Sequence, residues 1–340
     1  MSADEDRSAH AAAVRAGAEH GRTSGMMPPL PSKIADVPAA IDAWARSPAL
    51  AELVAAFHDG EGPPGDADLA RLLAWLEEFS LRWDFRGGKE RNLVVDQEFD
   101  SATHALILRD AEDLGLVGTL PPPSDSYDHV LILGGLVRAC LARPLHAASL
   151  LDSGEIRARS LAALGGYRPL RGDELELAAR SGHSHLTDEF DAMNAGVRAA
   201  FGVGEPMSDR GERSDKVGAS WRVIEYAGPH GTPLRVVGAP SSEPGMRRAN
   251  TPDTYAWFAS ELAKLRGGER ILVVTSDIYV RFQHADAMRM LALPFGVEIH
   301  AVGIRPGDVD PRLEQTFAPH HYLQEIRSTI RALRALHEAL

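Results

Sequence analysis

Short apolar runs alternate with longer amphipathic segments through the second two thirds of the chain. Runs rich in Val, Ile, Leu and Ala predict strands, and the spacing between them leaves room for a helix each time. The predicted strands are 129–133, 160–164, 234–237, 270–275 and 297–304. The predicted helices are 136–151, 173–180, 252–265, 281–293 and 324–336. This alternation is typical of parallel strands joined by crossover helices, so we predict an α/β, Rossmann-like, doubly wound, mostly parallel sheet.

The pattern before residue 120 is helical instead. Apolar positions recur at helical spacing over 38–57, with a proline that divides or bends the segment, and again after Asp66 or Asp68 and over 100–114. We therefore predict a mobile tail at 1–36, an N-terminal helical domain at 37–120 and the Rossmann-like domain at 121–340.

One stretch of the second domain breaks the alternation, and we treat 181–232 as an insertion. Its 187–201 segment has helical spacing, and its 210–220 segment is polar and loop-like. Residues 221–226 predict an extra strand that pairs with 234–237 through a Gly-Pro-His-Gly turn.

Composition and charge narrow the range of partners. The 340 residues include 48 acidic and 36 basic ones, a formal net charge of −12, which offers no general basic surface for nucleic acid. The chain opens with acidic residues rather than a signal peptide, has no uninterrupted apolar stretch long enough for a membrane span, and has one cysteine, Cys140. We expect a soluble, cytoplasmic protein with no membrane partner.

The predicted strand ends are where ligands bind in such sheets, and the first two end in glycine pairs. Gly134 and Gly135 permit a tight turn with amides that face an anion, and Arg138 lies one turn further on. Gly165 and Gly166 repeat this after the second strand. The next helix starts with Asp173, interpreted as a cap, and with Glu174 and Glu176 as site candidates.

The later strand ends carry denser polar groups. The loop after the 234–237 strand predicts an anion pocket; its candidates are Glu243, Arg247, Asn250 and Thr251. Hydroxyl groups, a carboxylate, a phenol and an arginine follow the 270–275 strand; these candidates are Thr275, Ser276, Asp277, Tyr279 and Arg281.

Two histidine pairs are the candidates for metal ligands in this sequence. His183 with His185, and His320 with His321, lack the HExxH arrangement and a carboxylate at fixed spacing, so we predict no metal site.

Taken together, these junctions resemble the DUF218 family of YdcF-like bacterial proteins over about residues 128–180 and 234–304. The two glycine pairs match its first loops, and Glu174 or Glu176 its helix-start glutamate. Its later motifs are matched by Glu243, Asn250, Thr251, Thr275, Ser276, Tyr279 and Arg281. Tyr279 stands where many members have histidine. The resemblance implies a Rossmann-like fold and, from one branch of the family, S-adenosylmethionine as a cofactor.

The leading hypothesis is an enzyme acting on a small anionic or nucleotide-like molecule at the carboxyl ends of the parallel strands. In this hypothesis Arg138, Arg247 and Arg281 hold charge, while Glu174, Glu243 and Asp277 are the catalytic groups that transfer protons. The alternative is a non-catalytic sensor or partner protein that binds S-adenosylmethionine or a nucleotide.

Overall fold

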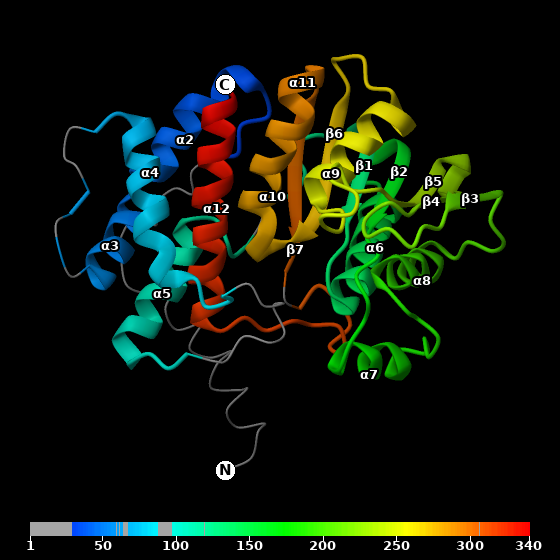
Figure 1. The fold of residues 1–340 in the computed structure, drawn as a ribbon, viewed down its shortest axis with the longest axis horizontal. Helices are drawn as coiled ribbons and strands as arrows, with labels where there is room; N and C mark the ends of the chain where they lie inside the picture. The colour runs from blue at the N-terminus through cyan, green and yellow to red at the C-terminus, as the bar shows by residue number, and fades with distance from the viewer. Residues whose placement is uncertain are drawn as a thin grey trace, which may run out of the picture.

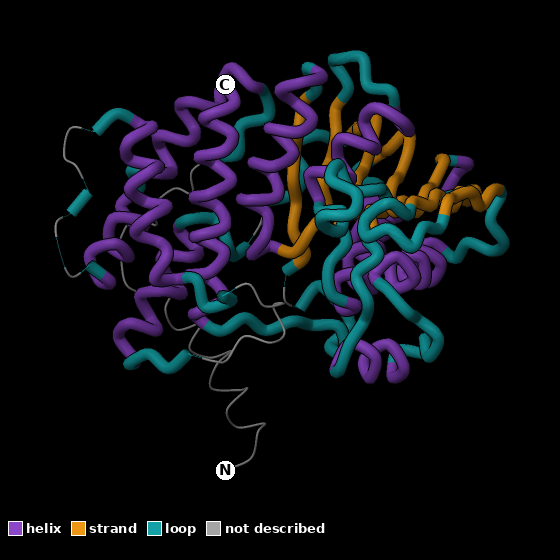
Figure 2. The backbone as a smooth tube through the Cα atoms, viewed as in Figure 1, coloured by secondary structure: helices purple, strands orange, loops and turns teal. Residues whose placement is uncertain are grey.

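The computed structural model describes residues 29–340 except 59, 61, 64–66, 88–96, 119 and 306. Most of the predicted tail, 1–28, therefore lies outside the described residues. One side of the molecule is helical and the other contains a sheet with its covering helices (Figures 1 and 2). The predicted α/β class, with a mostly parallel sheet and an N-terminal helical region, is confirmed.

The sheet has seven strands among the described residues, in the order β3-β4-β5-β2-β1-β6-β7. The strands are β1 (Ser126–Leu133), β2 (Arg157–Gly165), β3 (Ser208–Glu212), β4 (Trp221–Ala227), β5 (Pro233–Gly238), β6 (Arg270–Ser276) and β7 (Glu298–Ile304). Strands β5, β2, β1, β6 and β7 are parallel. The predicted antiparallel pairing of β4 with β5 is confirmed, and β3 extends this edge.

The side chains of successive strand residues point to opposite faces of the sheet, and both faces are covered. On β1, Val130 and Ile132 pack in one apolar cluster, and Leu131 and Leu133 pack in the other. A strand that is buried on both faces is a continuous apolar run, which is the pattern that predicted it. The helices of this half are α6 (Val137–Asp152), α7 (Asp173–Arg180), α8 (Glu189–Phe201), α9 (Thr251–Trp257), α10 (Val280–Ala287), α11 (Leu293–Phe295) and α12 (Pro319–Ala339).

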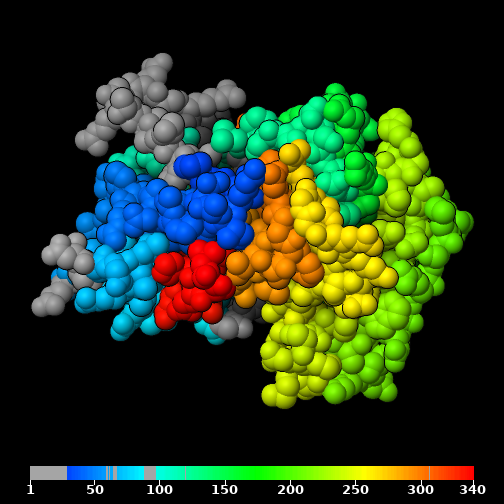
Figure 3. All heavy atoms as spheres, turned by 90° about the horizontal axis from the view of Figure 1, so that it is seen from above, coloured from blue at the N-terminus to red at the C-terminus, as the bar shows by residue number. Residues whose placement is uncertain are grey.

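The N-terminal helices share the core of one sheet face. They are α2 (Val37–Ala45), α3 (Pro48–Phe57), α4 (Leu69–Phe79) and α5 (Ser101–Asp113). Three begin at polar caps: the side chains of Ser47, Asp68 and Asp100 each accept a backbone N–H of the first turn. Helix α12 lies between these helices and α10, and Figure 3 shows it between the N-terminal and 270–305 regions of the surface. One apolar cluster therefore runs from α2 through α12 to the sheet.

Helix α6 continues through Pro144, which cannot donate the helical hydrogen bond to the carbonyl oxygen of Cys140. Gly196 of α8 packs against that carbonyl oxygen so closely that any Cβ there would overlap it. The proline and the glycine together let α6 and α8 pack closely on one face of the sheet.

Three details differ from the sequence prediction. Residues 210–212, predicted as loop, belong to the edge strand β3, whose last four residues are all exposed. Helix α12 begins at Pro319 rather than near 324. The segment 29–33 contacts the β7 edge, because Ser32 accepts a backbone hydrogen bond from Ile299 at 3.1 Å. No helix of the described residues is long and apolar enough to cross a membrane.

Candidate functional site

A cleft of about 490 Å³ opens at the carboxyl edge of the parallel strands. Its walls come from the loops that follow β1, β2 and β5, together with the start of the helix after β6. Eight of the predicted residues line it: Gly134, Gly135, Gly165, Gly166, Arg247, Asn250, Thr251 and Tyr279. The structure thus brings together residues from all four predicted strand ends.

Arginines dominate the charged groups of this cleft. Among the described residues, five arginines line it: Arg86, Arg143, Arg168, Arg247 and Arg248. One carboxylate among the described lining residues, Glu189, accompanies them. Glu174 and Asp253 pair with Arg168 and Arg247 from behind the lining, and the arginines still outnumber the carboxylates. Such a local excess of positive charge favours anions.

Arg143 links the ends of two neighbouring strands. Its side chain is buried, and its Nη1 donates to the carbonyl oxygens of Leu133, at 2.9 Å, and of Gly134. Its Nε and Nη2 lie 3.4 and 3.3 Å from the hydroxyl oxygen of Ser276. The guanidinium therefore fixes the ends of β1 and β6 while it borders the cleft.

Arg168 and Glu174 form a buried ion pair beside the first loop. Nη1 and Nη2 of Arg168 donate to the two carboxylate oxygens of Glu174 at 2.7 and 2.8 Å. The same carboxylate accepts the backbone N–H of Val137, the first residue of α6, at 3.1 Å. Glu174, predicted as catalytic, thus supplies the negative charge at the α6 N-terminus, and it does not line the cleft.

Glu189 is the carboxylate that the sequence analysis missed. Its carboxylate packs against Gly134, near Gly166, and its Oε2 lies 3.4 Å from Nε of Arg168. Burial raises the pKa of Glu189 to about 7, while Arg168 and Arg143 limit that rise. A carboxyl group with such a pKa can both donate and accept a proton near neutral pH. Nothing in its local sequence distinguishes it from a helix-start acid, because tertiary packing brings it to the glycine loops.

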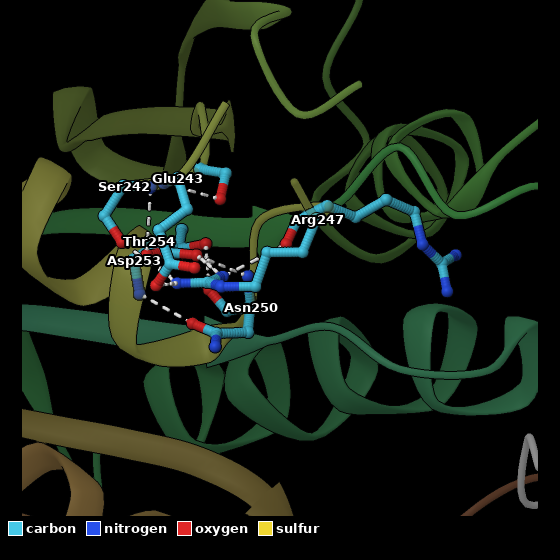
Figure 4. A network of polar contacts seen from close by, with 8 residues as sticks. Ser242, Glu243, Arg247, Asn250, Asp253 and Thr254 are labelled. Atoms are coloured by element: carbon cyan, nitrogen blue, oxygen red, sulfur yellow. Dashed lines mark hydrogen bonds and ion pairs between the residues drawn. The ribbon is translucent and has the colours of Figure 1, made fainter. Parts of the chain in front are cut away.

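The loop after β5 is held by its own ion pairs (Figure 4). Arg247 donates to both carboxylate oxygens of Asp253, at 2.5 and 3.1 Å. Burial opposes ionisation of Asp253, yet hydrogen bonds from Arg247, Ser242 and Asn250 hold its pKa at about 2. Asn250 caps α9 reciprocally with Asp253, as the sequence allowed. Arg247 therefore mainly orders the loop.

Glu243 lies outside the cleft. Its side chain is 60% exposed and its Oε1 lies 3.4 Å from Arg247. The structure therefore does not place this predicted catalytic carboxylate among the lining groups.

The residues of the motif after β6 do not all face the cleft. Tyr279 borders the main cleft, whereas Ser276 and Asp277 line a separate cavity of about 30 Å³. Arg281 lines another small cavity, of about 20 Å³, beside α2. It lies two residues after Tyr279, and residues two apart on a helix point in nearly opposite directions. Thr275 is fully buried and lines none of these cavities.

Asp277 and Arg138 serve local structure. Asp277 accepts the backbone N–H of Ile278 at 2.8 Å, and burial raises its pKa to about 6. Arg138 donates to the carbonyl oxygens of Arg312 and Glu314 at 2.8 and 2.9 Å, which fixes the segment before α12. Neither residue lines the main cleft. The described residues contain no group of three or more potential metal ligands close together.

The fold and the cleft define a Rossmann-like α/β protein with an arginine-rich site at the carboxyl edge of its sheet. The chain belongs to the Rv3785 family. It is 31% identical over 338 residues to "Uncharacterized protein Rv3785" of Mycobacterium tuberculosis, covering 90% of this chain and 91% of that protein. The same figures hold for "Uncharacterized protein Mb3814" of Mycobacterium bovis. The Rv3785 N-terminal domain model matches residues 30–115, and no solved structure matches the chain.

The expected membership of the DUF218 family is therefore wrong. The matching family model is that of Rv3785, and the full-length relatives agree with it. The sequence resemblance rested on glycine turns and polar strand ends, which any sheet of this class needs for its connections. S-adenosylmethionine and the roles carried over from that family lose their support.

Proposed function

We propose that this chain is an enzyme that binds a small anionic molecule in the arginine-rich cleft at the carboxyl ends of β1, β2, β5 and β6. The observation that carries the proposal is the set of five arginines that line the cleft, which outnumber Glu189 and the two carboxylates that pair with them from behind, Glu174 and Asp253. Phosphate and carboxylate groups are the usual partners of several convergent guanidinium groups.

Glu189 is the group proposed to transfer a proton. It borders the cleft between the two glycine loops, and its pKa of about 7 suits general acid or base catalysis at neutral pH. This assignment replaces Glu174, Glu243 and Asp277, none of which lines the cleft.

Binding is tested by calorimetric titration with inorganic phosphate, pyrophosphate and small dicarboxylates at constant ionic strength. Arg248 is exposed and lines the cleft, so Arg248→Gln should leave the fold intact and weaken binding about 5- to 10-fold. Arg157 is the matched control, because it is exposed and lies at the amino end of β2, at the other end of the strand from the cleft. The proposal fails if no anion binds, or if Arg157→Gln weakens binding as much as Arg248→Gln.

Catalysis is tested separately on the anions that bind. Each is incubated with the protein, and products are sought by mass spectrometry. Glu189→Gln should retain binding and reduce turnover by about 10²–10⁴-fold. Binding without turnover by the unmodified protein would support the non-catalytic alternative instead.

A further inference from the structure

A second cavity of about 330 Å³ lies beside the arginine-rich cleft. Four residues border both spaces: Arg86, Leu136, Tyr279 and Gln315. Both spaces open to solvent, so a molecule held by its charged end in the cleft can extend over the side chains of these shared residues into the second cavity.

Charge is nearly balanced in the second cavity, in contrast to the cleft. Among the described residues, its lining has three arginines and four carboxylates. The carboxylates are Asp173, Glu174, Glu314 and Glu325. Such a lining offers little net attraction to a second anion or to a cation, since each meets charges of both signs.

Hydrogen-bonding groups and a few apolar surfaces make up the rest of this lining. Hydrogen-bond donors and acceptors come from Gln315, Thr316, Gln324 and two histidines. Apolar contact comes from Phe85 and Leu177. A sugar ring presents both kinds of surface, with hydroxyl groups at its edge and C–H groups on its faces. It is also uncharged, which fits the charge balance.

Tyr279 lines both spaces, and its ring is held by its neighbours. Its ring is 6% exposed and makes edge contacts with Phe282 and Phe317 at centroid distances of 6.0 and 5.9 Å. The guanidinium of Arg143 lies 5.7 Å from the ring centre. The side chains between the arginine-rich cleft and the second cavity are thus well packed.

We infer that the substrate is a sugar phosphate, with its phosphate in the arginine-rich cleft and its hydroxylated ring in the second cavity. This inference rests on the proposed anion-binding function. It adds a second subsite of different chemistry and therefore a substrate class.

The test compares inorganic phosphate, ethyl phosphate and a set of pentose and hexose phosphates by calorimetric titration. At least one sugar phosphate should bind tenfold or more tightly than ethyl phosphate. Thr316 is exposed and lines only the second cavity of the two, so Thr316→Trp should fill it, abolish this preference and leave inorganic phosphate binding within twofold.

Ser260→Trp is the matched control, because Ser260 is exposed and borders neither cavity. It should keep the preference for the sugar phosphate. If phosphate binds but no sugar phosphate exceeds ethyl phosphate, or if Thr316→Trp keeps the preference, the inference is wrong and anion binding still stands. If neither phosphate nor any sugar phosphate binds, the proposed function itself fails.

Discussion

Gly134 illustrates how one residue without a side chain shapes the cleft. A Cβ at this position would overlap Oε1 of Glu189 and lie 2.5 Å from the carbonyl oxygen of Leu164. At Gly166 the nearest atom to a Cβ, again on Glu189, would be 3.8 Å away, an ordinary contact. The two glycines were predicted together from the sequence, yet only the first is sterically required.

Gly134→Ala should therefore destabilise the protein by about 1–3 kcal/mol, because a backbone carbonyl cannot move aside cheaply. Gly166→Ala should change stability by less than about 0.5 kcal/mol. Chemical denaturation of the two variants compares them directly. Equal destabilisation would show that Gly134 does not pack against the carbonyl oxygen of Leu164 as described.

Glu189 also gives the protein a specific pH dependence of stability. Its pKa is raised to about 7 in the folded state from about 4.5, so the folded protein binds the proton more tightly than the unfolded chain. The stabilisation of the folded state by this proton is complete below about pH 4.5 and is lost as the pH rises through 7.

Glu189→Gln should remove this loss, and its stability relative to the unmodified protein should rise between pH 5 and pH 8 by at most about 3 kcal/mol. The comparison isolates Glu189 from Asp110 and Asp277, whose pKa values burial also raises to about 6. Parallel denaturation curves at both pH values are the measurement. A constant difference between the two proteins would contradict an elevated pKa.

At the scale of elements, a side chain of helix α7 accepts a hydrogen bond from the start of helix α6. The sequence indicates acids at the start of α7 and a glycine turn before α6; it makes Glu174 and Glu176 site candidates and assigns Glu174 a catalytic role. Only Glu174 is buried, and its carboxylate reaches both Val137 N–H and Arg168. Its identification needed the packing of α7 on α6, which no local pattern encodes.

Glu174→Gln should cost about 1–3 kcal/mol of stability, because it removes the charge that pairs with Arg168 and faces the α6 N-terminus. Glu176 is exposed on the same helix, so Glu176→Gln should cost less than about 0.5 kcal/mol. Thermal and chemical denaturation distinguish the two. If both substitutions are equally mild, the contacts of Glu174 with Val137 and Arg168 do not stabilise the packing of α7 on α6.

Predictability from sequence varied among the elements in a physically understandable way. Strands β1 and β6 were predictable because each contains an uninterrupted apolar run, 130–133 and 271–274, whose residues are buried on both faces of the sheet. Strand β3 was missed because its exposed residues are polar or glycine. The start of α12 was missed because polar His320 is buried there, which hides the apolar pattern. The sequence grouped Arg281 with Tyr279 because it did not show that the two side chains face different cavities.

At the scale of the whole molecule, the N-terminal helices and the sheet share one apolar cluster, bridged by α12. Predicted from sequence as a separate domain, residues 37–120 nevertheless contribute core residues to the same cluster as β1, β6 and β7. Shared burial of this kind makes two regions unfold together. Three of the five tryptophans, Trp44, Trp75 and Trp83, lie in the helical part.

Replacing Trp221 and Trp257 with phenylalanine leaves tryptophan fluorescence that reports the helical part alone. We expect its urea midpoint to coincide with that of far-ultraviolet circular dichroism, which reports the whole chain. Two separate midpoints would show that 37–120 is an independent folding unit. The unmodified protein, followed by both signals, is the control.

Helix α12 also has a consequence for synthesis of the protein. Backbone and side-chain bonds join it to residues made far earlier: Gln324 accepts from the N–H of Arg86, and Arg327 donates to the carbonyl oxygen of Glu77. The helices near the beginning of the chain therefore wait, during translation, until some 240 further residues have been added. Through that interval their apolar faces lack the cover of α12 and are open to chaperones and proteases.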